Sequence, residues 1–187
     1  FSPHQDIISQ RMRTLYELTK DEKALIVISA PTLAQRLAPK DYILGNSLLL
    51  EKSDIVHIDK LRQQLTQAGY NAVDMVYQHG EFAVRGSLID IFPMGSEHAY
   101  RIELFDDEVE SLRAFDPDTQ RTTQQVDKID MLPAKECPLD DNAIQQFKNQ
   151  WHDYFDVDHR QCPVYQDVSE GFSPPGVEYY LPFFFEQ

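Results

Sequence analysis

Apolar residues recur at three- and four-residue intervals in several parts of the chain, and this spacing predicts amphipathic helices. The first helix is expected to begin at Ser2-Pro3, because a capping serine followed by proline is typical of a helix start. Another should begin at Asp59 and end at Gly69, since glycine commonly terminates helices. The predicted helices, two of them short, cover residues 2–18, 31–37, 59–68, 140–155 and 164–168.

Strand-like patterns fall into two kinds. Residues 24–30 (ALIVISA) form a continuous apolar run rich in β-branched side chains, which is typical of a strand buried on both faces of a parallel sheet. After Gly45, short or alternating apolar runs separated by glycine, proline and aspartate predict an antiparallel sheet instead. The strands expected in this second region cover residues 48–50, 74–77, 82–92, 99–105, 109–115 and 126–132.

This order of elements predicts an α/β architecture in three parts. Residues 1–45 combine helices with a buried strand, residues 46–133 form an antiparallel α+β unit, and residues 134–187 are again helical. Such an order arises when one domain is inserted between two halves of another. The chain begins with Phe1 rather than Met and ends soon after the aromatic run 183–185, so we expect a segment cut from a longer protein.

The composition argues against nucleic acid as a direct partner. The chain has 17 Lys and Arg against 31 Asp and Glu, a formal net charge of −14, which repels phosphate backbones and anionic membranes. No apolar run approaches the roughly 18 residues that a membrane helix needs, and no secretory leader is visible. Cys137 and Cys162 form no disulfide framework, so a reducing, cytoplasmic compartment is expected.

Sequence motifs for catalysis are absent or ambiguous. None of the seven glycines precedes a lysine, so the phosphate-binding G-x-x-x-x-G-K loop is missing, as is G-x-G-x-x-G. The histidines and cysteines show no metal-ligand spacing. An acidic cluster spans Glu103 to Glu110 and would suit metal-assisted catalysis, but Asp106-Asp107 separates two alternating strands and equally suits a hairpin turn.

The alternation around this hairpin defines a candidate binding face. Because successive strand residues point to opposite faces, Arg101, Glu103 and Phe105 should lie opposite the apolar core, and Arg85 should also point outward, before a glycine, Gly86, that allows a bulge. Arginine beside an exposed aromatic is typical of protein-binding hot spots. The alternative is a surface pair between arginine and Glu103, with Phe105 half-covered by the hairpin.

Two long runs resemble a known family. These are HGEFAVRGSLIDIFP (residues 79–93) and YRIELFDDEVESLR (residues 100–113), and FSPHQD and GVEYY at residues 1–6 and 176–180 add to the likeness. They resemble the amino-terminal UvrB-homology module of the Mfd family of bacterial transcription-repair coupling factors. The similarity extends over essentially the whole chain.

This resemblance implies a fold and a role. It implies a degenerate helicase-like, P-loop-type domain 1 that is incomplete at its start and lacks its nucleotide site, with an inserted domain 2 that binds UvrA. The family's UvrA contacts fall on Arg85, Arg101 and Phe105, with Gly86 and Glu103 beside them, whereas Ala83 stands where UvrB has a further arginine. ATP and Mg²⁺, RNA polymerase and DNA are expected only at other parts of the parent protein.

Three hypotheses remain open at this point. The first is a non-catalytic module that recruits UvrA to damage-stalled RNA polymerase, in which residues 46–133 bind alone. The second is an autoinhibitory module whose same face is covered by the carboxy-terminal domain of the parent chain. The third is a residual ATPase or nuclease that uses the cluster at Asp106–Glu108, and it predicts a cleft around Asp107.

Overall fold

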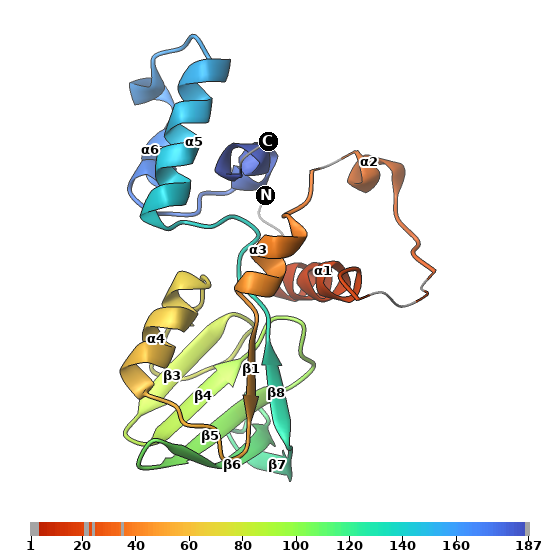
Figure 1. Cartoon of the computed structure of the whole chain (residues 1–187), viewed down its shortest axis with the longest axis vertical. Coiled ribbons are helices and arrows are strands. Elements are labelled where there is room, and N and C mark those ends of the chain that lie inside the picture. The colour runs from red at the N-terminus through yellow and green to blue at the C-terminus, as the bar shows by residue number, and fades with distance from the viewer. Residues whose placement is uncertain (1–3, 21–22, 24, 35, 186–187) are drawn as a thin grey trace.

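A computed structural model describes residues 4–20, 23, 25–34 and 36–185 and shows a mixed α/β protein with antiparallel sheets (Figure 1). The helices are α1 (Gln5–Glu17), α2 (Ala30–Leu33), α3 (Lys40–Gly45), α4 (Ile58–Gln67), α5 (Asp141–Tyr154), α6 (Pro163–Ser169) and the 3-10 helices η1 (His159–Gln161) and η2 (Val177–Phe184). The strands are β1 (Leu48–Glu51), β2 (Asn71–Ala72), β3 (Glu81–Arg85), β4 (Leu88–Phe92), β5 (Ala99–Phe105), β6 (Glu108–Phe115), β7 (Thr122–Gln125) and β8 (Lys128–Met131).

Strands β2 to β7 form a six-stranded sheet in sequence order, in which only the short β2–β3 pair is parallel. Two-residue turns join β3 to β4 and β5 to β6, so neighbours in the sheet are also neighbours in the chain. Strands β1 and β8 pair with each other in a separate two-stranded sheet, with Leu48 opposite Met131. The chain therefore enters and leaves the sheet-containing part through adjacent strands (Figure 1).

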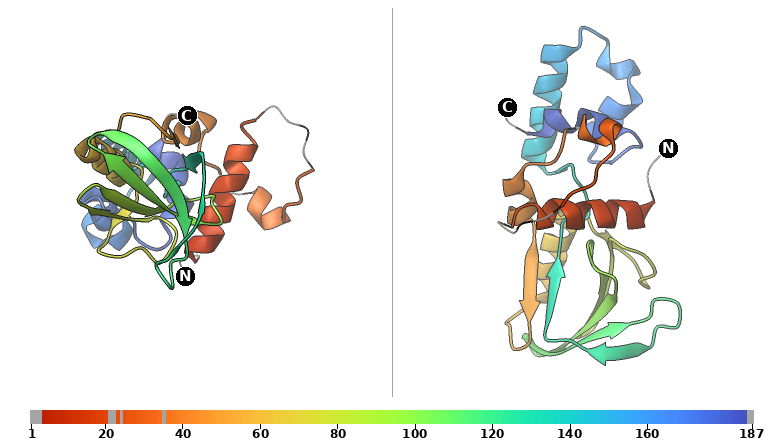
Figure 2. Two further views of the ribbon diagram at one scale, coloured as in Figure 1. Left: turned by 90° about the horizontal axis from the view of Figure 1, so that it is seen from below. Right: turned by 90° about the vertical axis from the view of Figure 1, so that its right-hand side faces the viewer.

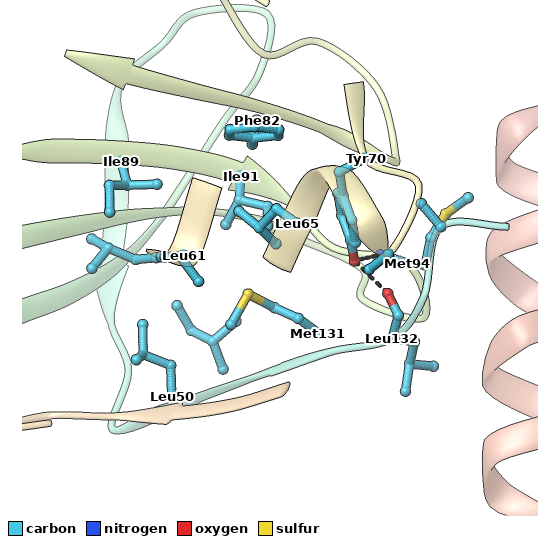
Figure 3. Close-up of a cluster of buried hydrophobic side chains, with 14 of the residues drawn as sticks. Leu50, Leu61, Leu65, Tyr70, Phe82, Ile89, Ile91, Met94, Met131 and Leu132 are labelled. Atoms are coloured by element: carbon cyan, nitrogen blue, oxygen red, sulfur yellow. Dashed lines mark hydrogen bonds between the residues drawn. The ribbon is translucent and has the colours of Figure 1, made fainter. Parts of the chain in front are cut away.

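One face of the six-stranded sheet is covered by α4 and by the β1–β8 pair, and this layer holds the main core (Figure 3). Leu65 of α4 lies beside Ile91 of β4, Leu61 extends toward Ile89, and all four side chains are almost fully buried. The Tyr70 hydroxyl donates to the Leu132 carbonyl at 2.6 Å and accepts from the Met94 amide at 3.2 Å. Burial raises the pKa of Tyr70 above its ordinary value.

A second core joins α5, α6 and η2. These helices lie together at one end of the molecule (Figure 2). Asp140 caps α5 by accepting from the amides of Asn142 and Ala143, each at 3.0 Å, which confirms the predicted cap. Phe147 and Trp151 lie on the buried face of this helix, as its spacing predicted. This helical part and the six-stranded sheet lie on opposite sides of α1 (Figures 1 and 2).

The predicted buried strand at residues 24–30 is wrong for the part that the structure describes. Residues 25–29 have no regular structure, and Leu25 and Val27 are 94% and 91% exposed. A buried parallel strand needs hydrogen-bonded neighbours and covered faces, and the described residues supply neither to this segment. Ala24 lies outside the described residues, as do Ser2 and Pro3. The helix expected over residues 31–37 is only α2, and α3 was not predicted.

Several predicted strand boundaries were also wrong. Residues 74–77 form no strand, and the expected strand over residues 82–92 is the β3–β4 hairpin. Arg85 pairs with Leu88 there, which leaves Gly86-Ser87 as a turn; Gly86 has φ +62°, a conformation that glycine adopts without strain. Strand β7 was missed, and the strand expected over residues 126–132 is β8, which pairs with β1 rather than with the main sheet.

The division into residues 1–45, 46–133 and 134–187 stays a prediction.

The predicted start of α4 was also displaced. Asp59 lies in the first turn of α4 rather than at its cap, which is His57.

Candidate protein-binding face

Two hairpins bring the predicted charged residues onto one face of the sheet. Their register places Asp90 opposite Arg101 and Arg101 opposite Arg113, and it places Glu103 opposite both Leu88 and Ser111. Residues directly opposite each other in antiparallel strands share a face. Arg85 is opposite Leu88 and therefore joins this set, on the face of the sheet opposite the α4 core.

The centre of this face is a carboxylate that sequence reasoning missed. Asp90 lies on the central strand β4 between Ile89 and Ile91, and although its side chain is charged, it is only 1% exposed. Its Oδ1 accepts from Arg101 Nε at 2.7 Å and its Oδ2 from Arg101 Nη2 at 2.9 Å, while Arg85 Nη2 contacts the same Oδ2. An aspartate inside the apolar run LIDIF was the available signal, because an unpaired buried charge is costly.

Two neighbours, Asp90 and Phe115, hold the Arg101 side chain in place. The guanidinium of Arg101 also lies 5.1 Å from the centre of the Phe115 ring, which is favourable for a cation over an aromatic face. The hydrogen bond to Asp90 raises the pKa of Arg101 above its ordinary value. The side chain of Arg101 is 22% exposed and that of Arg85 is 43% exposed, so Arg85 presents more of its charge to solvent.

The expected surface pair between an arginine and Glu103 is present, and its arginine is Arg113. Glu103 Oε2 accepts from the Ser111 hydroxyl at 3.1 Å and lies 3.7 Å from Arg113 Nη2. The middle of this face, away from the acidic turn at Asp106-Asp107, therefore combines three arginines with two carboxylates on a chain of net charge −14.

Phe105 lies at the end of this face, where β5 reaches the turn. A register shift between Glu103 and Leu104 is taken up by the extra residue Glu110 on β6, so β5 keeps its alternation and Leu104 stays buried. Phe105 is 69% exposed, so the expectation that the hairpin half-covers it is wrong. Phe105 is opposite Glu108, which is in turn bridged to Ile55. Ile55 is 66% exposed and adds an aliphatic side chain to the same side, which sequence reasoning also missed.

The turn beside Phe105 is held in place by a neighbouring segment. The Val56 amide donates to the Asp107 carbonyl at 2.6 Å, and the Asp54 carbonyl accepts from the Val109 amide at 2.9 Å. His57 Nδ1 lies 3.0 Å from Oδ2 of Asp107. Asp106-Asp107 thus forms a tight turn, not the cleft that the residual-enzyme hypothesis requires. Within the described ranges, no three His, Cys, Asp or Glu residues are grouped to hold a metal ion.

No helix in the part of the chain that the structure describes has the length and hydropathy needed to cross a membrane.

Comparison with known proteins supplies the family. Residues 48–137 match the model of the UvrB interaction domain, a range that includes the whole six-stranded sheet. Over all of its 187 residues the chain is 48% identical to the transcription-repair-coupling factor of Escherichia coli (strain K12). It is 46% identical to the corresponding protein of Haemophilus influenzae, again over the whole chain, and 36% identical to that of Bacillus subtilis over 70% of the chain.

The chain spans about 16% of the length of the first two of these relatives. Residues 48–137 thus match the UvrB interaction domain family, and the whole chain is similar to one segment of the bacterial transcription-repair-coupling factors.

Proposed function

We propose that the face formed by Arg85, Arg101 and Phe105 binds UvrA, with Gly86 and Glu103 inside the same interface. The observation that carries this proposal is a sheet face with three arginines in its middle that ends in an exposed aromatic side chain, within the range that matches the UvrB interaction domain. Guanidinium groups bind carboxylates through paired hydrogen bonds, so an acidic surface on UvrA is the expected counterpart.

Phe105 and Ile55 supply the apolar part of the proposed interface. Both are more than 60% exposed, and the turn at Asp106-Asp107, which is hydrogen-bonded to residues 54–56, holds Phe105 at a fixed position in the free protein. An aromatic anchor that needs little ordering contributes more of its burial free energy to binding. Ile55 extends the anchor to the segment that precedes α4.

In the parent protein, this module serves to recruit UvrA to damage-stalled RNA polymerase during transcription-coupled repair. The module itself binds and does not catalyse, because the carboxylates at Asp106-Asp107 are used in a turn and the sequence has no phosphate-binding loop. ATP hydrolysis with Mg²⁺, and contacts to DNA and RNA polymerase, belong to other parts of the parent.

The pairing of β1 with β8 supports the domain organisation that we propose. The sheet-containing unit at residues 46–133 enters and leaves at one place, as an inserted domain does. Residues 1–45 and 134–187 would then be parts of one surrounding, degenerate helicase-like domain.

A second role of the same face is autoinhibition. Exposed Phe105 and Ile55 form an apolar spot that a free protein tends to cover. Another domain of the parent chain, at its carboxy-terminal end, would cover the face until UvrA replaces it. Competition between UvrA and that domain for this chain separates simple docking from masked docking.

The test of the main proposal is a calorimetric titration of UvrA into the 187-residue chain. Arg85→Ala should weaken binding by about tenfold or more, about 1.4 kcal/mol, because a charge-assisted contact is lost. Arg62→Ala is the matched control, since Arg62 is an exposed arginine on α4, which covers the opposite face of the sheet. Equal affinities for the two folded variants would place the UvrA contact elsewhere, and no binding by the unmodified chain would refute the proposal.

A further inference from the structure

The buried carboxylate of Asp90 is more than the sheet needs for its stability. Its side chain is 0% exposed and its two neighbours in β4 are isoleucines. Replacing a buried ionic triad with apolar residues of similar volume often leaves stability unchanged or improves it, because taking charges out of water is costly. A buried charge at this position therefore suits a purpose other than packing.

The geometry shows what Asp90 does to its two partners. Both of its oxygens are used by Arg101, through the Nε–Nη2 edge of the guanidinium, and Oδ2 also takes Nη2 of Arg85. These contacts leave the Nη1 groups of both arginines outside the triad. A long arginine side chain loses considerable rotamer entropy when it is immobilised, and here that loss occurs on folding rather than on binding.

We propose that Asp90 is a positioning residue for partner binding, which fixes the guanidinium groups of Arg85 and Arg101 so that their remaining N–H groups meet carboxylates on the partner. This inference rests on the proposed function, in which the partner is an acidic surface of UvrA. Asp90 itself makes no contact with UvrA, because its side chain is fully buried beneath the two arginines.

The charge of Asp90 makes the test decisive. Asp90→Asn keeps the size of the side chain but removes one negative charge from a face that binds an acidic partner. If Asp90 acted only through the net charge of the face, this variant would bind UvrA more tightly. If Asp90 positions the arginines, the variant should bind at least about fivefold more weakly, because both arginines must then be ordered during binding.

Asp130→Asn is the matched control. Asp130 is exposed on β8, outside the six-stranded sheet, and its replacement changes the net charge of the chain by the same amount. The double variant Arg85→Ala with Asp90→Asn should lose less affinity than the two single losses combined, because Asp90 acts partly through Arg85. Additive losses, or unchanged or tighter binding by folded Asp90→Asn, would overturn the proposal.

Two further measurements cover a variant that does not fold. Asp90→Leu replaces the triad's carboxylate by an apolar side chain and should also weaken binding if it is folded by circular dichroism. In the unmodified chain, nuclear magnetic resonance relaxation measures the mobility of the Arg101 Nε–H group. This group should be as rigid without UvrA as with it, and a mobile Arg101 in the free chain would refute positioning. If Arg85→Ala weakens binding and Asp90→Asn does not, only this inference fails; if the unmodified chain does not bind UvrA, the proposed function fails.

Discussion

Phe105→Ala should weaken UvrA binding more than it weakens the fold. Complete burial of a phenylalanine side chain is worth about 1.5–3 kcal/mol. Phe105 is 69% exposed in the free protein, so covering that share on binding is worth about 1–2 kcal/mol, or about 5- to 30-fold in Kd. The part already buried contributes about 0.5–1 kcal/mol to folding.

The assay is a pair of measurements on the same variant. Calorimetric titration with UvrA gives the loss in affinity, and urea unfolding gives the loss in stability. Phe172→Ala is the matched control, because Phe172 is 61% exposed and follows α6 in the helical part of the chain. The reasoning is refuted if Phe105→Ala and Phe172→Ala have the same affinity, or if the stability loss of Phe105→Ala exceeds its loss in binding.

Three further predictions concern the fold around this face. Tyr70→Phe leaves the buried Leu132 carbonyl without its donor and should cost about 1–2 kcal/mol near neutral pH by urea unfolding. The folded-state pKa of Tyr70 is raised above its ordinary 10.0, so its contribution to the free energy of unfolding is present below pH 10 and is lost as the pH rises further. The stability deficit of Tyr70→Phe should therefore shrink at high pH, and a constant deficit would contradict this assignment. Burial raises the pKa of Cys137 to about 12, so iodoacetamide should modify the less buried Cys162 first in the native chain. Peptide mass spectrometry measures the labelling of each cysteine, and equal labelling would show that Cys137 is accessible. Gly86→Ala should destabilise the chain by about 1–2 kcal/mol because of the positive φ, with Gly86→Asn closer to the native protein, and equal melting temperatures for all three would exclude the left-handed turn.

The local pattern was enough to predict β5 and its turn. Residues 99–105 alternate between apolar and polar, and Asp106-Asp107 marks the turn, so Arg101 and Phe105 were assigned to one face from neighbouring residues alone. Asp140 was likewise identified as a cap from its place before an amphipathic run. Both features depend on interactions within a few residues, which a sequence displays directly.

Features that depend on distant pairing were missed. Asp90 gains its role from Arg101 on the neighbouring strand β5, and Ile55 is brought near Phe105 by a bridge to Glu108 of β6. The run at residues 25–29 has the composition of a buried strand, but composition does not provide the neighbouring strands that such burial needs. The sequence therefore predicted which face to examine, whereas the contacts that organise the face required the fold.

The pairing of β1 with β8 has a mechanical consequence. Leu48, where the chain enters, is opposite Met131, where it leaves, and the pair closes at Glu51 and Lys128. Tension applied through the two flanking segments pulls on the same end of this pair, so its hydrogen bonds are loaded one after another rather than together. The pair should open like a zipper at low force, while the six-stranded sheet, with its binding face, lies outside the line of pull.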